Sequence, residues 1–488
     1  MDFVKIGCGL VRLNILRATQ IKEPITLMTT QKQKVQKLVK KLQRRYQKKK
    51  RKKKSSVRHT RAIQRDRTMR QLAAPPDEKL TARLSDLVKP TQEEEQTWFE
   101  QFGLRMRKLT LSVMVATVIS LIWRQIGAGG SEAARLLQLE GLLWVPKMKV
   151  SQQAISERLR TFPAPLFLQL LSQRLAVFQQ RSQARQTPLP PVLDWAQKRY
   201  QAILAVDGST LDALLRQVGL LRGQQKHPLA AKIMTILNVC TLLPDTIWFE
   251  PDAKANDQRF WPQILAAIPA GALLLLDGGF TNFSYFKQFS NPARKITFII
   301  PARSNLVFDV KQLFAKTSSY HDYLVWVGAD DDRQLLRLVK LRYQGLWYEY
   351  LTNELHPALL PASYLAALYG HRWRIEDAFN TIKRLFGLAY FWTGSQNGVE
   401  LQLWATWLVY IVVLDLTDAI AAVLHKPLLA ISIEMVYRGL YHFGQAYTRG
   451  EADDPVPYLV LHADLLRIVK SAFPSQSHWF NLTILPDP

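Results

Sequence analysis

The chain has 488 residues, of which 48% are hydrophobic, so it is long enough for two or three domains with a sizeable core. Its formal net charge is +26 at pH 7, and residues 31–70 alone hold 19 Lys and Arg residues against one Asp. Only two cysteines are present, Cys8 and Cys240, which excludes a disulfide framework and a cysteine zinc site and predicts a reducing, cytoplasmic location.

The basic segment near the N-terminus predicts a polyanionic partner, nucleic acid before membrane. Residues 1–80 are expected to form a flexible extension that ends near an Ala-Ala-Pro-Pro boundary at 73–76. A run of seven cations inside it is a candidate for phosphate contacts, which give affinity without sequence information; a solvated tail is the open alternative. These cations are Lys48, Lys49, Lys50, Arg51, Lys52, Lys53 and Lys54.

Two apolar runs, 109–123 and 403–424, require comparison with membrane spans. The first is shorter than the roughly 20 residues that a span needs. The second carries Asp415 and Asp418, whose charges are costly at the centre of a bilayer. Both runs are therefore predicted to be buried helices, and no membrane partner is expected.

Residues 81–185 are predicted to be helical, with a polar, proline-rich linker at 183–191. Ser131 and Ser151 are predicted N-caps of the third and fourth helices. This pair could form a helix-turn-helix in which Arg158 reaches DNA, although a plain helical bundle also fits. The expected helices are 92–106, 108–125, 131–142, 151–160 and 164–182.

From Tyr200 onward the pattern changes to that of strands. Asp207 and Asp277 are each expected at the end of an apolar strand, in AILAVDGST and GALLLLDGGF. Residues 304–352 are predicted as a small β insertion, 399–424 as a long apolar helix, and 426–488 have no assignment. Further strands are expected at 230–243, 245–251 and 295–303, with a helix at 254–268.

One stretch, YGHRWRIEDAFNTIK at 369–383, is predicted as a single helix. At about 100° per residue, Tyr369, Arg372, Glu376 and Lys383 fall within roughly 60° of one another on such a helix. A carboxylate among cations on a half-buried face suits a site that binds a polyanion and holds a metal. The alternative is a solvated face with an ordinary Arg372–Glu376 ion pair.

The pattern Y-x2-R-x3-E-x6-K, preceded by the two strand-end aspartates, resembles the signature of the bacterial insertion-sequence-four family of DDE transposases, in its Tyr-Arg-Glu-Lys subgroup. The strings DGS, DGGF and YLTN at 207, 277 and 350 fit the same family. The resemblance covers about 100–425; the first 80 residues lie outside it and the last 60 match weakly. It implies an α/β chain with a ribonuclease-H-like catalytic domain at 195–303 and 353–425, interrupted by the β insertion and preceded by a helical DNA-end-binding domain. The basic arm comes ahead of these domains in the chain, and its role does not follow from the resemblance.

The resemblance also implies an activity: binding the terminal inverted repeats of a mobile element, nicking its ends and joining the 3′-hydroxyls to target DNA. Asp207, Asp277 and Glu376 would be catalytic and would hold two Mg²⁺ ions, with Mn²⁺ able to substitute, because Mg²⁺ prefers carboxylate oxygens. Tyr369, Arg372 and Lys383 would grip DNA phosphates. The implied partners are double-stranded DNA, both element ends and target, and a second copy of the chain in the DNA complex.

Two alternatives stay open on the sequence: a hydrolysis-only nuclease of the same fold, and a degenerate transposase that binds DNA without cutting it. The three intact acids argue against the second. Trp326 and Trp347 in the insertion are predicted as core residues, with stacking on a flipped base as the minority alternative implied by the resemblance.

Overall fold

The computed structural model describes residues 87–124, 130–211, 231–252, 255–289, 291, 293–388, 391–393 and 395–470. The chain divides into two units, Met1–Ala62 and Ile63–Pro488, and every described residue belongs to the second. The predicted basic extension, including the cations at 48–54, therefore lies outside the described residues.

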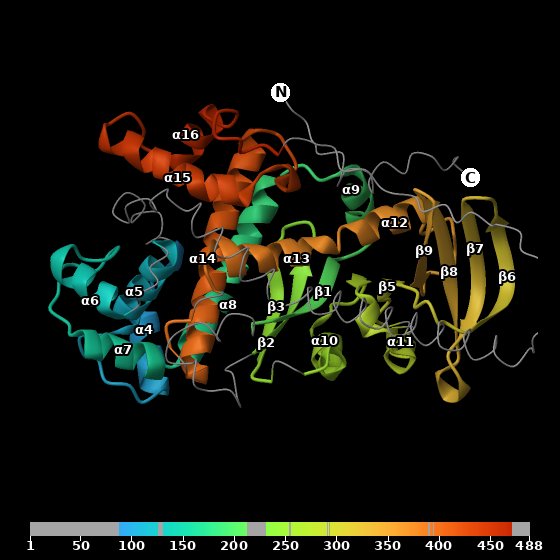
Figure 1. The fold of residues 1–488 in the computed structure, drawn as a ribbon, viewed down its shortest axis with the longest axis horizontal. Coiled ribbons are helices and arrows are strands. Elements are labelled where there is room, and N and C mark those ends of the chain that lie inside the picture. The colour runs from blue at the N-terminus through green and yellow to red at the C-terminus, as the bar shows by residue number, and fades with distance from the viewer. Residues whose placement is uncertain are drawn as a thin grey trace, which may run out of the picture. The chain divides into compact units, whose positions relative to one another are not determined.

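The N-terminal part of the described chain is helical, as predicted (Figure 1). Ser151 caps its helix as expected, because its hydroxyl accepts a hydrogen bond from the Ala154 N–H at 3.1 Å. The prediction for Ser131 is wrong: the helix begins one residue earlier, at Gly130, whose missing side chain allows close contact with Ser156. The helices are α4 (Gln92–Gln101), α5 (Leu111–Trp123), α6 (Gly130–Leu139), α7 (Gln152–Thr161), α8 (Ala164–Arg185) and α9 (Pro191–Gln197).

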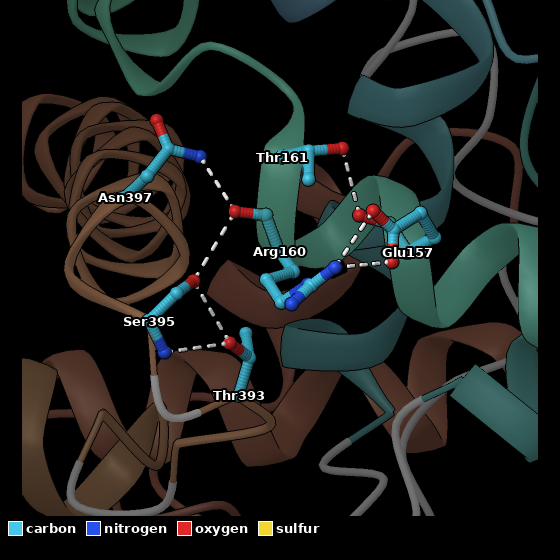
Figure 2. Close-up of polar contacts among 6 residues, drawn as sticks. All are labelled: Glu157, Arg160, Thr161, Thr393, Ser395 and Asn397. Carbon is cyan, nitrogen blue, oxygen red and sulfur yellow. Dashed lines mark hydrogen bonds and ion pairs between the residues drawn. The ribbon is translucent and has the colours of Figure 1, made fainter.

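The end of α7 is docked onto the start of α14 (Gln396–Val423), more than 230 residues later in the chain (Figure 2). The carbonyl of Arg160 accepts hydrogen bonds from the Ser395 hydroxyl and from Asn397 Nδ2, each at 3.1 Å. Asn397 also donates to the Phe162 carbonyl at 2.8 Å and accepts from the Ala164 N–H at 3.0 Å. One amide side chain thus satisfies three backbone groups at the junction between α7 and α8.

We expect Asn397→Ala to lower the free energy of unfolding by roughly 2–3 kcal/mol, since three hydrogen bonds to backbone groups are lost at about 1 kcal/mol each. Chemical denaturation of the purified chain measures this change. The neighbouring Gln396 is exposed and donates to Glu400 Oε1 at 2.9 Å, so Gln396→Ala is the matched control and should change stability by less than about 0.5 kcal/mol. Equal effects of the two substitutions would contradict the role given to Asn397.

A nine-stranded mixed sheet follows, in the order β3-β2-β1-β4-β5-β9-β8-β7-β6. β1, β4 and β5 are parallel neighbours, whereas β2 is antiparallel to β1, and β9 is antiparallel to β5. The predicted β insertion is therefore not a separate sheet, because its four strands continue the same sheet through β9 (Figure 1). The strands are β1 (Ile203–Thr210), β2 (Lys232–Asn238), β3 (Pro244–Glu250), β4 (Leu273–Leu276), β5 (Thr297–Pro301), β6 (Phe308–Lys316), β7 (Tyr320–Val327), β8 (Gln334–Tyr343) and β9 (Leu346–Thr352).

Each face of this sheet packs against its own hydrophobic core, because side chains alternate along a strand. From β1, Ile203 and Ala205 join a core shared with α13 (Trp373–Asn380) and α14. Leu204 and Val206 join a second core containing residues of α10 (Trp261–Ala267) and α11 (Phe283–Phe289). Asp207 therefore has the same side-chain direction as the residues that face α13.

Three local predictions need correction. The predicted single helix at 369–383 is instead α12 (Ala362–Gly370), a turn at 371–372, α13 and a π-helix, η7 (Thr381–Leu385). The predicted helix at 254–268 is a 3₁₀ turn, η4 (Asp257–Phe260), followed by α10 with a proline in its first turn. Asp207 lies inside β1, opposite Thr235, because β1 extends three residues further to pair with β2.

α14 is long and apolar enough to cross a membrane by length and composition, but 83% of its most apolar window is buried inside the protein. Its two acids are paired with α8: Asp415 lies 2.7 Å from Arg185 and 3.1 Å from Arg181, and Asp418 lies 2.9 Å from Arg185. The prediction of a buried helix is confirmed. The C-terminal region, unassigned from sequence, contains η8 (Leu428–Ala430), α15 (Ile433–Thr448) and α16 (Pro455–Leu461).

Candidate active site

The two predicted catalytic aspartates lie side by side at one edge of the parallel strands. β1 and β4 are hydrogen-bonded parallel neighbours, with Val206 directly opposite Leu276. Asp207 follows Val206 within β1, and Asp277 follows Leu276 and caps the short 3₁₀ turn η5 (Gly278–Phe280) by accepting from the Gly279 N–H at 3.1 Å. Because both strands run in the same direction, both carboxylates reach the same end of the sheet.

Glu376 joins them through Arg372, which contacts all three acids. The guanidinium Nη2 lies 2.8 Å from Glu376 Oε1 and 3.9 Å from Asp277 Oδ1, and Nη1 lies 3.4 Å from Asp207 Oδ2. These three carboxylates are the ones that the sequence predicted, and the structure gathers them around one cation. The Arg372 side chain is 5% exposed, so this ion cluster is shielded from water on the arginine's side.

The pKa of Asp207 is raised by its surroundings. It lies at about 6, above its ordinary value, chiefly because the carboxyl is buried and in smaller part because of the charges of Asp277 and Glu376. The Arg372 guanidinium and the Gly208 N–H, which donates to Asp207 Oδ1 at 2.8 Å, act the other way without cancelling the effect. Three converging carboxylates with one arginine leave room for more positive charge.

Three hard oxygen donors of this kind fit the ligand preference of a divalent cation such as Mg²⁺. Within the described parts of the chain, however, no three or more His, Cys, Asp or Glu side chains are arranged so that they could hold a metal ion. The carboxylates are instead arranged around the Arg372 guanidinium. The residue types therefore fit a divalent metal, and binding one requires them to rearrange relative to Arg372.

Lys383 reaches the same strand from the π-helix. Its Nζ donates to Ser209 Oγ at 2.5 Å and to the Thr210 carbonyl at 2.7 Å, just beyond Asp207 in β1. A π-helical turn holds more residues than an α-helical turn and is frequent at functional sites. Lys383 thus contacts β1 two to three residues beyond Asp207, from a helix type that the sequence did not predict.

Tyr369, at the end of α12, packs its ring against Tyr350 of β9 at 5.0 Å between centroids. Burial raises the pKa of its phenol to about 12, so the hydroxyl is protonated at neutral pH and can donate a hydrogen bond. The guanidinium of Arg372 lies 6.0 Å from this ring and 4.9 Å from the ring of Trp373. All four residues of the predicted signature are therefore near one another, although three separate elements and a turn supply them.

The turn η4 contacts the backbone that follows each of the two aspartates. The sequence analysis missed this turn, because it predicted these residues as part of one regular helix. Gln258 Nε2 donates at 2.6 Å to the carbonyl of Gly279, two residues after Asp277. Asp257 forms an ion pair with Lys232 and packs against Gly208, directly after Asp207. The available signal was the polar Asn-Asp-Gln string ahead of an apolar helix, in which Asn256 caps η4.

The insertion tryptophans occupy different environments. Trp347 is 39% exposed, so the prediction that it belongs to the core is wrong. It lies near the start of β9, next to the turn that follows β8. It lines a cavity of about 530 Å³ together with Tyr350, Tyr369 and Trp373. Trp326 is half-buried and has Lys311 and Arg333 within 6 Å of its ring.

A second cationic site surrounds the start of α7, the helix that carries Arg158. A cavity of about 600 Å³ is lined there by Arg107, Lys108, Lys149 and Arg158. Among the described residues, none of these four cations forms an ion pair, and the adjacent Glu157 is paired with Arg160 at 2.8 Å. The structure thus adds three cations to Arg158, and their spacing across two loops and a helix could not be read from sequence.

Residues 201–412 match the family described as "Transposase DDE domain", a range that includes all three acids. This part of the chain is therefore similar to transposase DDE domains. A Sinorhizobium fredii protein, y4zB, whose name assigns it only provisionally to the transposases, is 29% identical over 170 residues, which are 33% of this chain and 46% of that protein. The chain thus spans less than half the length of this relative.

Among solved structures, the chain resembles the piggyBac transposase in a cryo-EM structure of its synaptic complex with hairpin DNA. The similarity covers 81% of this chain and 86% of that chain at 12% sequence identity, with a TM-score of 0.39.

Proposed function

We propose that this chain is a metal-dependent transposase that binds the terminal inverted repeats of its own insertion sequence, cleaves the DNA and joins the ends to a target. The observation that carries the proposal is the convergence of Asp207, Asp277 and Glu376 on one guanidinium, inside the range that matches a transposase DDE domain. We place its action in the cytoplasm, on double-stranded DNA, with a second copy of the chain in the DNA complex.

The topology and the signature support the finer classification. The order β3-β2-β1-β4-β5, with β2 antiparallel to β1, supports a ribonuclease-H-like catalytic domain. The pattern formed by Tyr369, Arg372, Glu376 and Lys383 supports the insertion-sequence-four family and its Tyr-Arg-Glu-Lys subgroup.

In this proposal, Asp207, Asp277 and Glu376 hold two Mg²⁺ ions, for which Mn²⁺ can substitute. When bound, such a pair of ions activates the attacking oxygen and stabilises the leaving oxygen of a phosphodiester. Arg372 holds the acids together before DNA arrives and offers a forked donor to a phosphate afterwards. Lys383 supplies a point charge beside β1, and the neutral Tyr369 phenol donates to DNA without forming a covalent intermediate.

Residues 81–185 are the proposed end-binding domain. Its support is the cationic cavity of Arg107, Lys108, Lys149 and Arg158 at the N-terminus of α7, where peptide N–H groups also favour anions. The cations at 48–54 are proposed to add sequence-independent affinity for the DNA backbone.

A strand-joining assay separates this function from the two alternatives. Supplied with pre-cut ends bearing 3′-hydroxyls, a transposase joins them to a target duplex in the presence of Mg²⁺. A hydrolysis-only nuclease cleaves intact ends but joins nothing, and a non-catalytic relative binds ends without cleaving them. Absence of both cleavage and joining from a folded, end-binding protein would overturn the proposal.

We expect Arg372→Ala to lower the free energy of unfolding by about 1–3 kcal/mol, because three carboxylates lose the cation that they share. Mg²⁺ should restore much of this stability, since a divalent cation can neutralise the same acids, but it should not restore nicking, because the phosphate contact is gone. Arg372→Lys should recover only part of the nicking.

Thermal unfolding and nicking across a Mg²⁺ titration measure both effects. Arg333→Ala is the matched control, because Arg333 forms a single exposed ion pair with Asp309 at 2.9 Å. It should change stability little and independently of Mg²⁺. If Mg²⁺ stabilises the Arg372→Ala variant no more than it stabilises Arg333→Ala, the Arg372 guanidinium does not take the place of a divalent metal ion.

A further inference from the structure

The short turn η4 contacts the segments of both candidate aspartates through two consecutive residues. Gln258 binds the backbone that follows Asp277, and Asp257 packs against Gly208, which directly follows Asp207. Neither residue of η4 belongs to the sheet or to α13. A single turn outside the sheet is therefore attached to both of the segments whose carboxylates converge in the candidate site.

The side-chain amide of Gln258 is held by four hydrogen bonds. Its Nε2 donates to the carbonyls of Gly279 and Thr281, at 2.6 and 3.3 Å. Its Oε1 accepts from Trp261 Nε1 at 3.1 Å and from Asn282 Nδ2 at 3.0 Å. These bonds use both donors and both acceptor positions of the amide, so the orientation of this side chain is fixed by its surroundings.

The bond to Gly279 acts directly on Asp277. The N–H of Gly279 donates to Asp277 Oδ2 at 3.1 Å, while the carbonyl of the same residue accepts from Gln258. Phe280, in the same turn, packs edge-on against Trp261, with the ring centroids 5.8 Å apart. The turn that orients the Asp277 carboxylate is thus attached to η4 and α10 by polar and by apolar contacts.

Asp257 supports the other strand, β1, from the face opposite α13. Side chains alternate along a strand, so position 208 faces away from the side to which Asp207 points. The Asp257 carboxylate packs against Gly208 in space that a larger side chain there would need. Lys232, whose side chain is 10% exposed, forms an ion pair with Asp257 and donates to the Ala255 carbonyl at 2.8 Å. Asp257 is therefore anchored behind β1 and is not a fourth ligand beside the three acids.

We propose that η4 positions Asp207 and Asp277 relative to each other, and that this spacing makes the site prefer Mg²⁺ over the larger Ca²⁺. Gln258 and Asp257 are the positioning residues, acting through the backbone that follows each aspartate. The proposal rests on the proposed function, because it concerns the metal that the acids hold. Mg²⁺ requires nearly ideal octahedral geometry at about 2.0–2.1 Å, whereas Ca²⁺ accepts irregular geometry at about 2.3–2.6 Å. A small displacement of one carboxylate therefore weakens Mg²⁺ binding more than Ca²⁺ binding.

The test compares Gln258→Met with the parent by thermal unfolding in titrations of Mg²⁺ and of Ca²⁺, without DNA. Methionine has a similar length and removes all four hydrogen bonds. The apparent dissociation constant of each ion follows from the dependence of the unfolding temperature on metal concentration. The constant for Mg²⁺ should rise about tenfold, as for other residues that orient a metal ligand. The constant for Ca²⁺ should rise less than about threefold, because that ion tolerates displaced ligands.

Ile268→Ala is the control for a purely structural effect. Ile268 is buried in the same core but at the far end of α10 from η4, so its truncation leaves a cavity and lowers stability. It should lower the unfolding temperature and leave the ratio of the two dissociation constants unchanged. An equal change of this ratio in Ile268→Ala and Gln258→Met would overturn the proposal in favour of a general packing effect. Asp257→Asn, which keeps the shape of its side chain, should change the ratio in the same direction as Gln258→Met and does not depend on the folding of that variant.

Nicking of DNA ends gives a second readout. In Gln258→Met, nicking at low Mg²⁺ should fall about tenfold and should recover as Mg²⁺ is raised, because the three acids are intact and only ion binding is weakened. Unchanged constants for both ions in Gln258→Met and Asp257→Asn, with Mg²⁺-dependent nicking by the parent, would overturn this proposal and leave the proposed function in place. If Mg²⁺ changes neither the stability nor the nicking of the parent, both proposals fail.

Discussion

Asp207→Asn, Asp277→Asn and Glu376→Gln should each reduce DNA-end nicking by about a thousandfold or more while leaving end binding within a few-fold of the parent. Removal of one member of a catalytic set that acts as a unit costs nearly as much activity as removal of all of it. The amides keep the shape of each side chain but lose the negative charge that holds a divalent ion. Binding should survive because the cationic cavity at α7 is remote in sequence and has none of these acids in its lining.

The measurement pairs end binding with nicking in Mg²⁺ and in Mn²⁺ for each variant. Asp309→Asn is the control, because Asp309 is an exposed acid of β6 that forms an ion pair with Arg333. It should nick like the parent. Nicking by any of the three acid variants at more than about a tenth of the parent rate would remove that residue from the catalytic set.

The two aspartates could be predicted because their signal is local. Asp207 and Asp277 each follow an unbroken apolar run, and such a run predicts a strand that is buried on both faces. The apolar runs do not show that β1 and β4 are adjacent, with Val206 opposite Leu276, because strand pairing depends on tertiary structure. The extension of β1 past Asp207 could not be read in the same way, since it depends on pairing with β2.

The helical signature was predicted as a single regular helix, and this geometry is wrong. A helical wheel assumes one regular helix, whereas the chain turns at 371–372 and continues into a π-helix after Asn380. Arg372 consequently leaves the helix face and reaches two aspartates that lie far earlier in the chain, in addition to Glu376. Contacts over such separations depend on tertiary packing, which periodicity does not contain.

The β insertion shows the same limit on a larger scale. Its strand character could be predicted from alternating residues, but its attachment could not, because pairing of β9 with β5 is set by the register between Pro301 and Tyr350. This pairing places Tyr350 against Tyr369 and so brings the insertion to the edge of the candidate site. A sequence reading that treats 304–352 as a separate domain misses this contact.

The buried ion pair of the insertion leads to the largest stability effect that we expect. Asp322 and Arg337 are both 0% exposed, and Arg337 Nη2 and Nε donate to the two oxygens of Asp322 at 2.7 and 2.9 Å. The hydroxyl of Tyr320 also donates to Asp322, at 2.5 Å, and Arg337 Nη1 donates to the Leu360 carbonyl at 2.6 Å. Because Leu360 directly precedes Pro361, the N-cap of α12, this pair ties the insertion to the helix that carries Tyr369.

Asp322→Ala should therefore lower the free energy of unfolding by about 3–5 kcal/mol, the cost of leaving an uncompensated charge in the interior. Asp309→Ala, which breaks the exposed pair with Arg333, is the matched control and should cost about 0–1 kcal/mol. The double variant Asp322→Ala/Arg337→Met should recover much of the loss, since an apolar side chain needs no partner. Urea unfolding of the parent, Asp322→Ala, Arg337→Met, the double variant and the Asp309→Ala control measures the coupling. If the double variant is as unstable as the sum of its single changes, the loss comes from packing and the bond to Leu360, and the charge itself is not the cause.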